Sequence, residues 1–255
     1  MWSSIDTIHK PTSLTEAWEL SQTPGTTVIC GGTYLAAERD PAITGLIPLN
    51  AHLSHRITRG KSTLSIGAGV DVDNLVSFNW PSPFQPLAEA ARQSCPSANI
   101  RNQRSIGGEL GASRFNSELI ILLHALNPQL KIVQAQESTE YLVEWNGDGI
   151  IREMALEIAP EIRMEYLRFA PIPSAAPFLC VAGVTAGAGC RIVVGGNVNS
   201  LRVLEFDTNT LGVEQQGLVL EHAEDTLLAD HFGGVAYKRK LLVTALRRLG
   251  KALCT

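Results

Sequence analysis

Apolar residues recur along the chain with two different periods, and their alternation predicts a mixture of helices and strands. Ser13 and Glu16 form a capping-box pattern ahead of a short amphipathic helix. Runs rich in β-forming residues follow at 26–30 and 46–49, and the first of them stops at a pair of glycines. Strand and helix therefore alternate in the first part of the chain, as they do in a small α/β unit.

The middle of the chain continues this mixture. Pro86 stands at the first turn of one predicted helix, and Asn116 and Ser117 offer caps for another that is strongly apolar. The sequence Asn146-Gly147-Asp148-Gly149 predicts a turn between two strands. We expect helices at residues 71–78, 86–93 and 118–126, and strands at residues 62–67, 131–135, 141–145 and 154–158.

The last third is predicted to begin with strands and end with helix. Ala186-Gly187-Ala188-Gly189 separates two β-type runs and predicts a hairpin. The basic cluster Lys238-Arg239-Lys240 is interpreted as a solvated helix face. We expect strands at residues 178–185, 191–195 and 201–206 and helix from near residue 221, and we divide the chain into domains at 1–57, 58–162 and 163–255.

Composition and charge narrow the classes of protein. Of the 255 residues, 45% are hydrophobic and 18% are charged, which is ordinary for a globular chain. The net charge of −4 gives no reason to expect a nucleic-acid partner or an acidic membrane surface. No apolar run approaches the roughly 20 residues of a membrane span. The N-terminal residues do not resemble a secretory signal, so we expect a cytoplasmic protein.

The cysteines and histidines do not predict a metal site. The five cysteines are scattered and contain no Cys-x-x-Cys pair, which argues against an iron–sulfur or zinc site in this chain. His52 and His55 have no cysteine or acidic cluster beside them and are interpreted as loop histidines, whereas His124 is expected within a helix. Buried reduced thiols are the expected state of Cys30, Cys180 and Cys190, and Cys95 and Cys254 complete the set.

A glycine pair, Gly31 and Gly32, follows the strand predicted at residues 26–30. Glycine lacks Cβ, so the backbone can turn sharply here and bring its N–H groups close to a ligand. Consecutive N–H groups in such a turn form a concavity that suits phosphate, and Thr33 adds a hydroxyl. A simple tight turn without any ligand is the alternative interpretation of these residues.

A second and richer glycine segment spans residues 100–113. It contains Gly107 and Gly108, the arginines Arg101 and Arg104, and the hydroxyl of Ser105. Neither segment has the spacing of a Rossmann or Walker motif. Two separate glycine pairs suit a pyrophosphate that is held from two sides. Arg101 and Arg104 could reach phosphate or flank an interface with another subunit, and an ordinary solvated side chain is an equally open interpretation of Arg104.

The order and the residue patterns of these segments resemble those of the FAD-binding subunit of molybdenum hydroxylases, of the xanthine dehydrogenase and aerobic carbon monoxide dehydrogenase type. The family segment Ala-Gly-Gly-Thr-Asp-Leu is matched by Cys30 to Leu35, and Ile-Gly-Ala is matched at residues 66–68. The family signature Arg-Asn-x-x-Thr-Ile-Gly-Gly-Asn-Leu is matched by Arg101 to Leu110, and Glu118 stands at a later Asp position. Residues 236–240 and 247–249 resemble the terminal helix, so the resemblance covers nearly the whole chain.

The resemblance implies an α+β fold, with the two-lobed FAD-binding fold of the vanillyl-alcohol oxidase and xanthine dehydrogenase type and a small α+β C-terminal domain. It implies that backbone N–H groups of both glycine segments hold the FAD pyrophosphate, with hydroxyl contacts from Ser105 and Ser117. Glu118 would lie near the ribose and adenine, and Arg168 near the flavin. The cofactor-binding residues implied in this way are Cys30, Gly31, Gly32, Thr33, Tyr34, Leu35, Arg101, Asn102, Ser105, Ile106, Gly107, Gly108, Glu109, Ser117, Glu118 and Arg168.

Several positions depart from the family pattern. Tyr34 replaces Asp, Glu109 replaces Asn, Ser105 replaces Thr, and Glu118 replaces a later Asp. A carboxylate beside a pyrophosphate is electrostatically unfavourable unless it points away. The loop that the family has in this region is also shortened here, to residues 146–150.

The implied function is electron transfer within a complex. A molybdopterin-binding large subunit would oxidise the substrate, and a small subunit with [2Fe–2S] clusters would pass the electrons to FAD on this chain. FAD carries the redox chemistry in such proteins, so no catalytic side chain and no metal ligand is expected here. Two alternatives stay open, a scaffold subunit that has lost FAD and a stand-alone flavoprotein oxidase.

Overall fold

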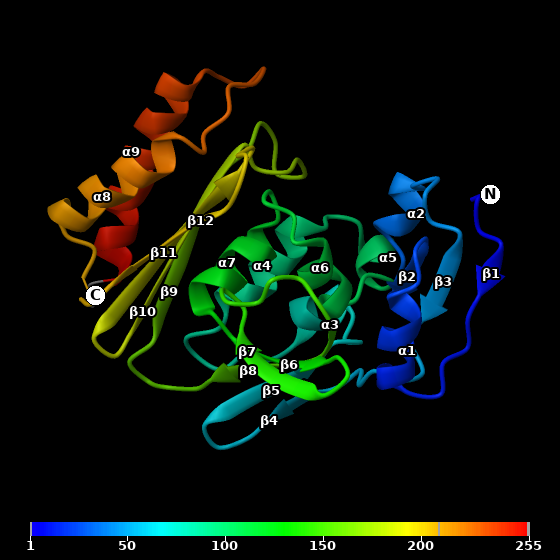
Figure 1. Cartoon of the computed structure of the whole chain (residues 1–255). Helices are drawn as coiled ribbons and strands as arrows, with labels where there is room; N and C mark the ends of the chain where they lie inside the picture. Colours follow the sequence, from blue (N-terminus) through cyan, green and yellow to red (C-terminus); the bar gives the residue numbers. More distant parts are fainter. Residues whose placement is uncertain (1, 209, 254–255) are drawn as a thin grey trace. The chain divides into compact units, whose positions relative to one another are not determined.

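The computed structural model describes residues 2–208 and 210–253, and the chain forms two compact units (Figure 1). Unit 1 contains the residues up to Leu75 together with Ser97–Ala112 and Pro128–Glu157. Unit 2 contains Val76–Pro96, Ser113–Asn127 and the residues from Ile158 onward. The two glycine segments therefore share unit 1, although they lie far apart in the sequence. The expected domain boundaries after residues 57 and 162 stay a prediction.

The N-terminal part of unit 1 is a small parallel sheet with the order β1 (Thr7–Ile8), β3 (Gly45–Pro48) and β2 (Thr26–Ile29). Helix α1 (Leu14–Ser21) packs on this sheet through the buried Ala17. Ser13 caps the helix, since its hydroxyl accepts from the Glu16 N–H at 3.1 Å. The Glu16 carboxylate accepts from the Thr12 N–H instead of from Ser13, so only half of the predicted capping box forms. The short helix α2 (Leu35–Glu38) follows β2.

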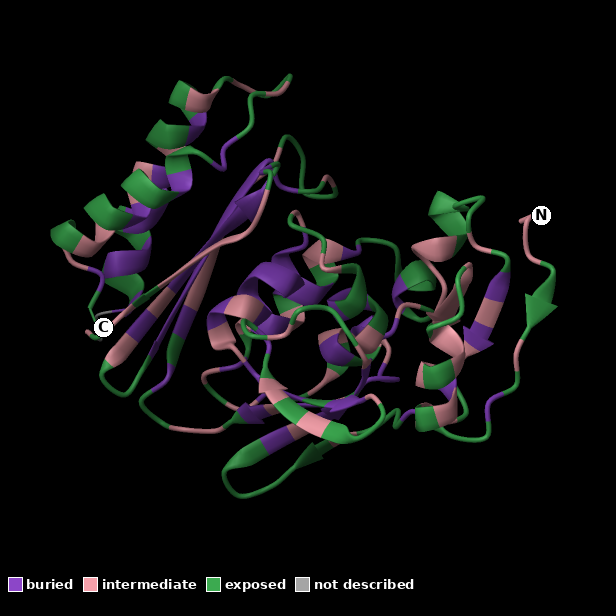
Figure 2. Cartoon of the chain, in the orientation of Figure 1, coloured by how far each residue is buried: buried purple, intermediate pink, exposed green. Residues whose placement is uncertain are grey.

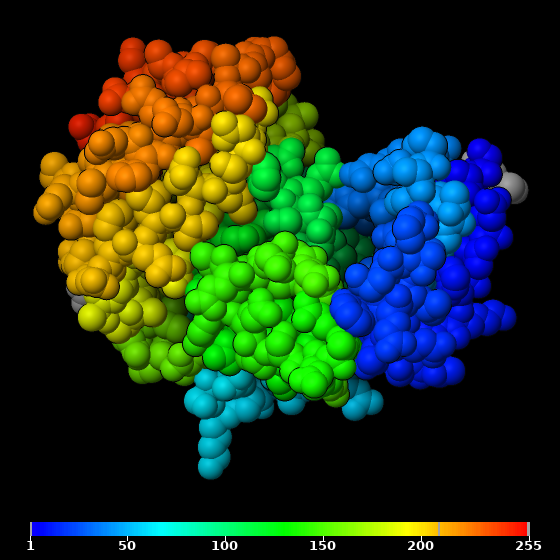
Figure 3. Space-filling model, viewed as in Figure 1, coloured from blue at the N-terminus to red at the C-terminus, as the bar shows by residue number. Residues whose placement is uncertain are grey.

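The second sheet of unit 1 is antiparallel, with the order β4 (Ile57–Arg59), β5 (Thr63–Gly67), β8 (Ile150–Glu157), β6 (Gln129–Val133) and β7 (Glu137–Tyr141). The exposed tip between β4 and β5 projects from the surface of this unit (Figure 3). Helices α5 (Ala98–Arg101) and α6 (Ile106–Ala112) carry the second glycine segment, and α6 packs against β8. Helix α3 (Val72–Ser77) begins in this unit.

The strand expected at 141–145 was placed wrongly. The strand is β7, Glu137–Tyr141, and residues 142–145 form a turn in which the Trp145 indole donates to the Asp148 carbonyl at 2.6 Å. The side chains of β7 are polar because this strand forms the edge of the sheet. The aromatic and apolar residues after it were therefore mistaken for the strand.

Unit 2 is a sheet with helices on both faces. Its antiparallel strands have the order β12 (Arg202–Phe206), β11 (Gly189–Gly196), β10 (Leu179–Ala186) and β9 (Arg163–Phe169). Helices α4 (Pro86–Ser94) and α7 (Glu118–Leu126) pack on one face, and α8 (Val213–Glu224) and α9 (Val235–Leu253) cover the other (Figure 1). Strand β10 is buried from Leu179 to Thr185, because both of its faces are covered (Figure 2).

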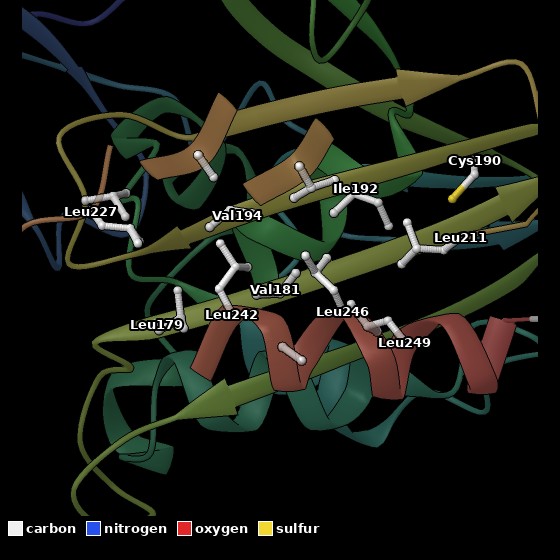
Figure 4. Packing of buried hydrophobic residues seen from close by; sticks show 14 of the residues in the cluster. Leu179, Val181, Cys190, Ile192, Val194, Leu211, Leu227, Leu242, Leu246 and Leu249 are labelled. Atoms are coloured by element: carbon white, nitrogen blue, oxygen red, sulfur yellow. The ribbon is translucent and has the colours of Figure 1, made fainter. Parts of the chain in front are cut away.

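The core of unit 2 lies between the sheet and helix α9. Leu242, Leu246 and Leu249 recur along α9 at helical spacing and point toward Val181 and Ile192 of the central strands (Figure 4). The predicted hairpin is present, since Ala186 pairs with Gly189 around a two-residue turn. The apolar spacing along α9 therefore results from the packing of this helix on one face of the sheet.

Some sequence expectations for unit 2 were incomplete or wrong. Strand β9 was not predicted, and the helical region begins at Val213 and is interrupted by a loop at 225–234. Lys238 is completely buried, so the basic cluster is not a uniformly solvated face.

Cys30 is half-buried, and Cys95, Cys180 and Cys190 are buried free thiols, whereas Cys254 lies outside the described residues. Within the described ranges, no helix has the length and apolarity that crossing a membrane requires.

Candidate functional site

Unit 1 brings the two glycine segments into direct backbone contact. A Cβ on Gly31 would lie 1.7 Å from the carbonyl oxygen of Gln103 and 3.2 Å from the Cα of Arg104. No side chain fits there, so the glycine permits the close approach of the loop after β2 to the loop after α5. Gly32 has a φ of +69°, a left-handed conformation that favours glycine. Both glycines of the first pair are therefore needed by the chain itself.

The first segment presents backbone donors. Among residues 2–208 and 210–253, no hydrogen-bond acceptor faces the N–H groups of Gly32 and Thr33. Gly32 has a left-handed backbone and Tyr34 a helical one, and this combination of conformations is found in turns whose N–H groups bind anions. Cys30 stands immediately before this turn, and burial raises the pKa of its thiol. Such a turn suits an anion, and the protonated Cys30 adds no opposing charge.

In the second segment, the backbone N–H groups of residues 106–109 have hydrogen-bond partners within the chain. The Ile106 and Gly107 N–H groups donate to the carbonyls of Val70 and Ala68, both at 2.8 Å. The Gly108 N–H donates to the Ser105 hydroxyl at 3.2 Å, and the Glu109 N–H donates to the Ser105 carbonyl at 2.9 Å. All four groups have partners within the chain. These bonds dock the segment on the chain just after β5, at Ala68, and the expected role of the four N–H groups toward phosphate stays a prediction.

The two glycines of the second pair have different surroundings. A Cβ on Gly107 would lie 2.8 Å from the Cβ of Ala68 and 2.9 Å from its carbonyl oxygen. A Cβ on Gly108 would meet only the Ser105 hydroxyl, at 3.0 Å, and a Cβ on Gly111 would meet nothing within 4 Å. Gly107 is thus required for packing, whereas Gly108 and Gly111 leave one side of α6 open.

Charged and aromatic side chains join the two segments. Glu109 is fully buried, and its Oε2 accepts from the Tyr34 hydroxyl at 2.8 Å. The Arg104 guanidinium stacks on the Tyr34 ring at 4.1 Å from its centroid and donates from Nε to the Thr33 hydroxyl at 3.2 Å. Its Nη1 lies 3.5 Å from Glu109 Oε2. The carboxylate at position 109 is therefore held by Tyr34 and Arg104.

Arg101 has a structural partner in the same unit. Its Nε donates to Asp73 at 2.7 Å, and the arginine is largely buried. This ion pair joins α5 to α3 and so supports the loop that carries Arg104. The neighbouring Asn102 is exposed and ends α5, where its backbone N–H donates to the Ala98 carbonyl. Neither observation assigns a ligand contact to these two residues.

The remaining candidate residues form a cluster in unit 2. Ser117 caps α7, with its hydroxyl accepting from the Ile120 N–H at 3.3 Å, and Glu118 is fully buried in the first turn. Arg168 on β9 donates from Nε to Glu118 at 2.6 Å. Its other nitrogens donate to the carbonyls of Pro173 and Ala175. These side chains therefore lie together, and the arginine holds both a buried carboxylate and the following loop.

The histidines contact the backbone. His52 Nε2 lies 2.8 Å from the Pro11 carbonyl oxygen, and His55 Nε2 lies 3.1 Å from that of Asn50. His124 Nδ1 lies 2.9 Å from the Ile120 carbonyl within α7, and burial lowers the pKa of His124. In the part of the chain that the structure describes, no three acidic, histidine or cysteine side chains are grouped for a metal ion.

The chain is similar in sequence and in fold to known proteins. A family model described as the FAD binding domain in molybdopterin dehydrogenase matches residues 3–145. No curated protein matches the sequence significantly. The fold is similar to carbon monoxide dehydrogenase from Hydrogenophaga pseudoflava, with a TM-score of 0.79, 18% identity and 98% of both chains covered.

Two further solved structures are similar over nearly the whole chain. Carbon monoxide dehydrogenase from Oligotropha carboxidovorans has a TM-score of 0.79 and 16% identity, with 98% of both chains covered. Quinoline 2-oxidoreductase from Pseudomonas putida 86 has a TM-score of 0.75 and 18% identity, with 98% of this chain and 96% of that chain covered. These similarities confirm the expected α+β fold of the FAD-binding type.

Proposed function

Because the chain belongs to the family of FAD-binding domains in molybdopterin dehydrogenases, we propose that it is the electron-transfer flavoprotein subunit of a molybdenum hydroxylase-type complex. FAD is the cofactor of this family. In the proposal, a partner chain with [2Fe–2S] clusters delivers electrons that a molybdopterin-binding chain has taken from the substrate. An external acceptor then receives them from this subunit.

The donor set of unit 1 fits the anionic part of FAD. The N–H groups of Gly32 and Thr33 lie in a turn with no acceptor of its own among the described residues, and the Arg104 guanidinium lies beside Thr33. A pyrophosphate needs hydrogen-bond donors and positive charge, and this turn supplies both. This arrangement is the observation that carries the proposal.

The second glycine segment has a supporting role in this proposal. Its N–H groups dock α6 on Ala68 and Val70, and Gly108 and Gly111 keep one side of the helix open for the cofactor. The buried Glu109 carboxylate accepts a hydrogen bond from the Tyr34 hydroxyl and lies beside the Arg104 guanidinium, which reduces its repulsion of a phosphate. The bound flavin supplies the redox chemistry, and the chain binds and orients it.

The candidate residues of unit 2 keep the roles that the family resemblance implies. Ser117 and Glu118 are proposed to contribute on the ribose and adenine side, and Arg168 on the flavin side. Their observed contacts support a rigid placement, because each side chain is held by a hydrogen bond within unit 2. Cytoplasmic localisation is part of the same proposal, as is an interface with the iron–sulfur chain.

The test is native purification followed by analysis of the bound chromophore and accompanying chains. We expect one FAD for each chain, complete release of the yellow chromophore on acid denaturation, and co-purification of molybdenum and iron–sulfur chains. Flavin that stays on the precipitated chain would contradict non-covalent binding. Partner chains without flavin would support the scaffold alternative, and a flavin-loaded chain that oxidises a substrate alone would support the oxidase alternative.

A further inference from the structure

Arg104 falls on a variable position of the family signature, between the matched Asn102 and Ser105. No role follows for it from that signature, and the sequence left open whether it is a solvated residue. The structure decides against solvation, because only 12% of its side chain is exposed. The side chain instead spans from its own segment to Thr33 of the first segment.

The contacts of Arg104 leave some N–H groups of its guanidinium without a close hydrogen-bond acceptor among the described residues. Nε donates to Thr33 at 3.2 Å, but Nη1 lies 3.5 Å from the Glu109 carboxylate. Charge-assisted N–H···O bonds are usually about 2.7–2.9 Å long, so this pair is loose. Within the described residues, Nη2 of Arg104 has no acceptor. The planar fork of an arginine matches phosphate oxygens well.

Tyr34 and Glu109 hold this guanidinium in place. The Tyr34 ring lies beneath it at 4.1 Å from the centroid, which restrains its plane, and the Tyr34 hydroxyl donates to Glu109. The two residues that depart most from the family motifs therefore contact each other and the same arginine. Their pairing also explains how a carboxylate is tolerated at position 109.

We propose that Arg104 is an additional phosphate-binding residue of this chain, and that Tyr34 and Glu109 are positioning residues that aim it at the turn of Gly32 and Thr33. The inference rests on the proposed function, since the FAD pyrophosphate is the anion concerned. The guanidinium contributes positive charge where the backbone contributes N–H groups. Tyr34 and Glu109 keep the arginine extended toward the first segment before the ligand arrives.

The test compares Glu109→Gln with Arg104→Met/Glu109→Gln in the full chain, by titrating apoprotein with FAD and following flavin fluorescence. Neither variant leaves a buried carboxylate without its arginine, so folding is preserved more easily than in Arg104→Met alone. We expect the double variant to bind FAD at least about tenfold more weakly than Glu109→Gln, because a charge-assisted contact is lost. Arg59→Met, which changes an exposed arginine of β4, is the matched control.

Salt dependence and conservative variants distinguish a phosphate contact from a structural role. The FAD affinity of Glu109→Gln should fall with rising salt more steeply than that of the double variant, because only Glu109→Gln retains the Arg104 charge. Arg104→Lys/Glu109→Gln should recover much of the salt dependence and part of the affinity. Tyr34→Phe should weaken FAD binding by a smaller factor, about threefold, and leave the salt dependence in place.

Two outcomes separate this inference from the function on which it rests. Equal FAD affinity and equal salt dependence of Glu109→Gln and the double variant would overturn the role of Arg104 while the proposed function stands. An unsubstituted chain that binds no FAD, with its fold intact by circular dichroism, would instead overturn the proposed function. Unchanged FAD affinity in Tyr34→Phe would remove Tyr34 from the positioning residues.

Discussion

Both units of the chain bury a glutamate completely beside an arginine, but they use the arginine differently. In unit 2, Arg168 donates to Glu118 at 2.6 Å and to the carbonyls of Pro173 and Ala175, so Nε, Nη1 and Nη2 all have partners. In unit 1, Arg104 approaches Glu109 only to 3.5 Å, and its Nη2 has no acceptor within the described residues. The two guanidinium groups have nearly equal exposure, 12% for Arg104 and 14% for Arg168.

The difference shows that burial alone does not distinguish an arginine that stabilises the fold from one that is available to a ligand. The informative quantity is how many of its N–H groups the chain itself has satisfied, and at what distance. The Arg168 guanidinium has a partner within the chain on each of its three nitrogens, so fewer of its N–H groups are left for a ligand. A partly satisfied guanidinium such as that of Arg104 gains a hydrogen bond when an anion arrives.

The largest effect that tests this comparison is on the stability of unit 2. Arg168→Met should lower the free energy of unfolding by about 3–5 kcal/mol, because Glu118 is left buried without its charge partner. Arg168→Met/Glu118→Met should recover most of that loss, since both charges are removed together. Urea unfolding followed by circular dichroism gives the values. The control is Arg163→Met, which changes an exposed arginine on the same strand. An equal loss of unfolding free energy in this control would show that Arg168 has no special role in the stability of unit 2.

The next effect concerns the two adjacent glycines of α6. Gly108→Val should weaken FAD binding more than a hundredfold, which corresponds to about 3 kcal/mol, because the side chain would fill the open side of the helix. Gly107→Val should instead lower the stability of the apoprotein, since its side chain would collide with Ala68. FAD titration and thermal unfolding of both variants separate the two effects. Normal FAD affinity in Gly108→Val would show that the second glycine pair is only a turn.

A smaller effect on stability is expected from a second buried ion pair of unit 2, between Lys238 and Asp230. Lys238 is buried and donates to Asp230 at 2.6 Å. Burial alone would raise the pKa of Asp230, but hydrogen bonds from Lys238, Asn197 and the Phe232 N–H lower it to about 2. Because the folded pKa lies below the ordinary value of 3.8, the stabilisation is present above that value and is lost as the pH falls through about 2.

Lys238→Met/Asp230→Asn, which leaves neither charge buried alone, should therefore lower the free energy of unfolding at pH 7 by about 2 kcal/mol at most. The deficit should shrink steadily between pH 4 and pH 2 as the parent carboxylate becomes protonated. Urea midpoints measured at several pH values provide the check. Asp207→Asn, which changes an exposed aspartate of the same unit, is the control. A deficit that stays constant down to the lowest pH would mean that the Asp230 charge does not contribute.

The sequence by itself determined most helices and strands, the family and the importance of both glycine segments. Local signals were sufficient for these features. Ser13 and Ser117 cap helices because a hydroxyl satisfies nearby N–H groups, and Leu242, Leu246 and Leu249 share a face because of the helical period. The edge strand β7 was missed because its polar residues carry no apolar pattern.

Only the tertiary structure decided how the individual residues of those segments are used. Gly31 is required by the carbonyl of Gln103, and Gly107 is required by Ala68, whereas a Cβ on Gly108 would meet only the Ser105 hydroxyl. Tyr34 and Glu109, which looked like separate departures from the family, form a hydrogen bond across 75 positions of sequence. Such contacts depend on which loops the fold brings together, and no local propensity encodes them. The burial of Arg104 and Lys238 could not be predicted from the sequence for the same reason. Whether a charged side chain is solvated depends on the elements packed around it.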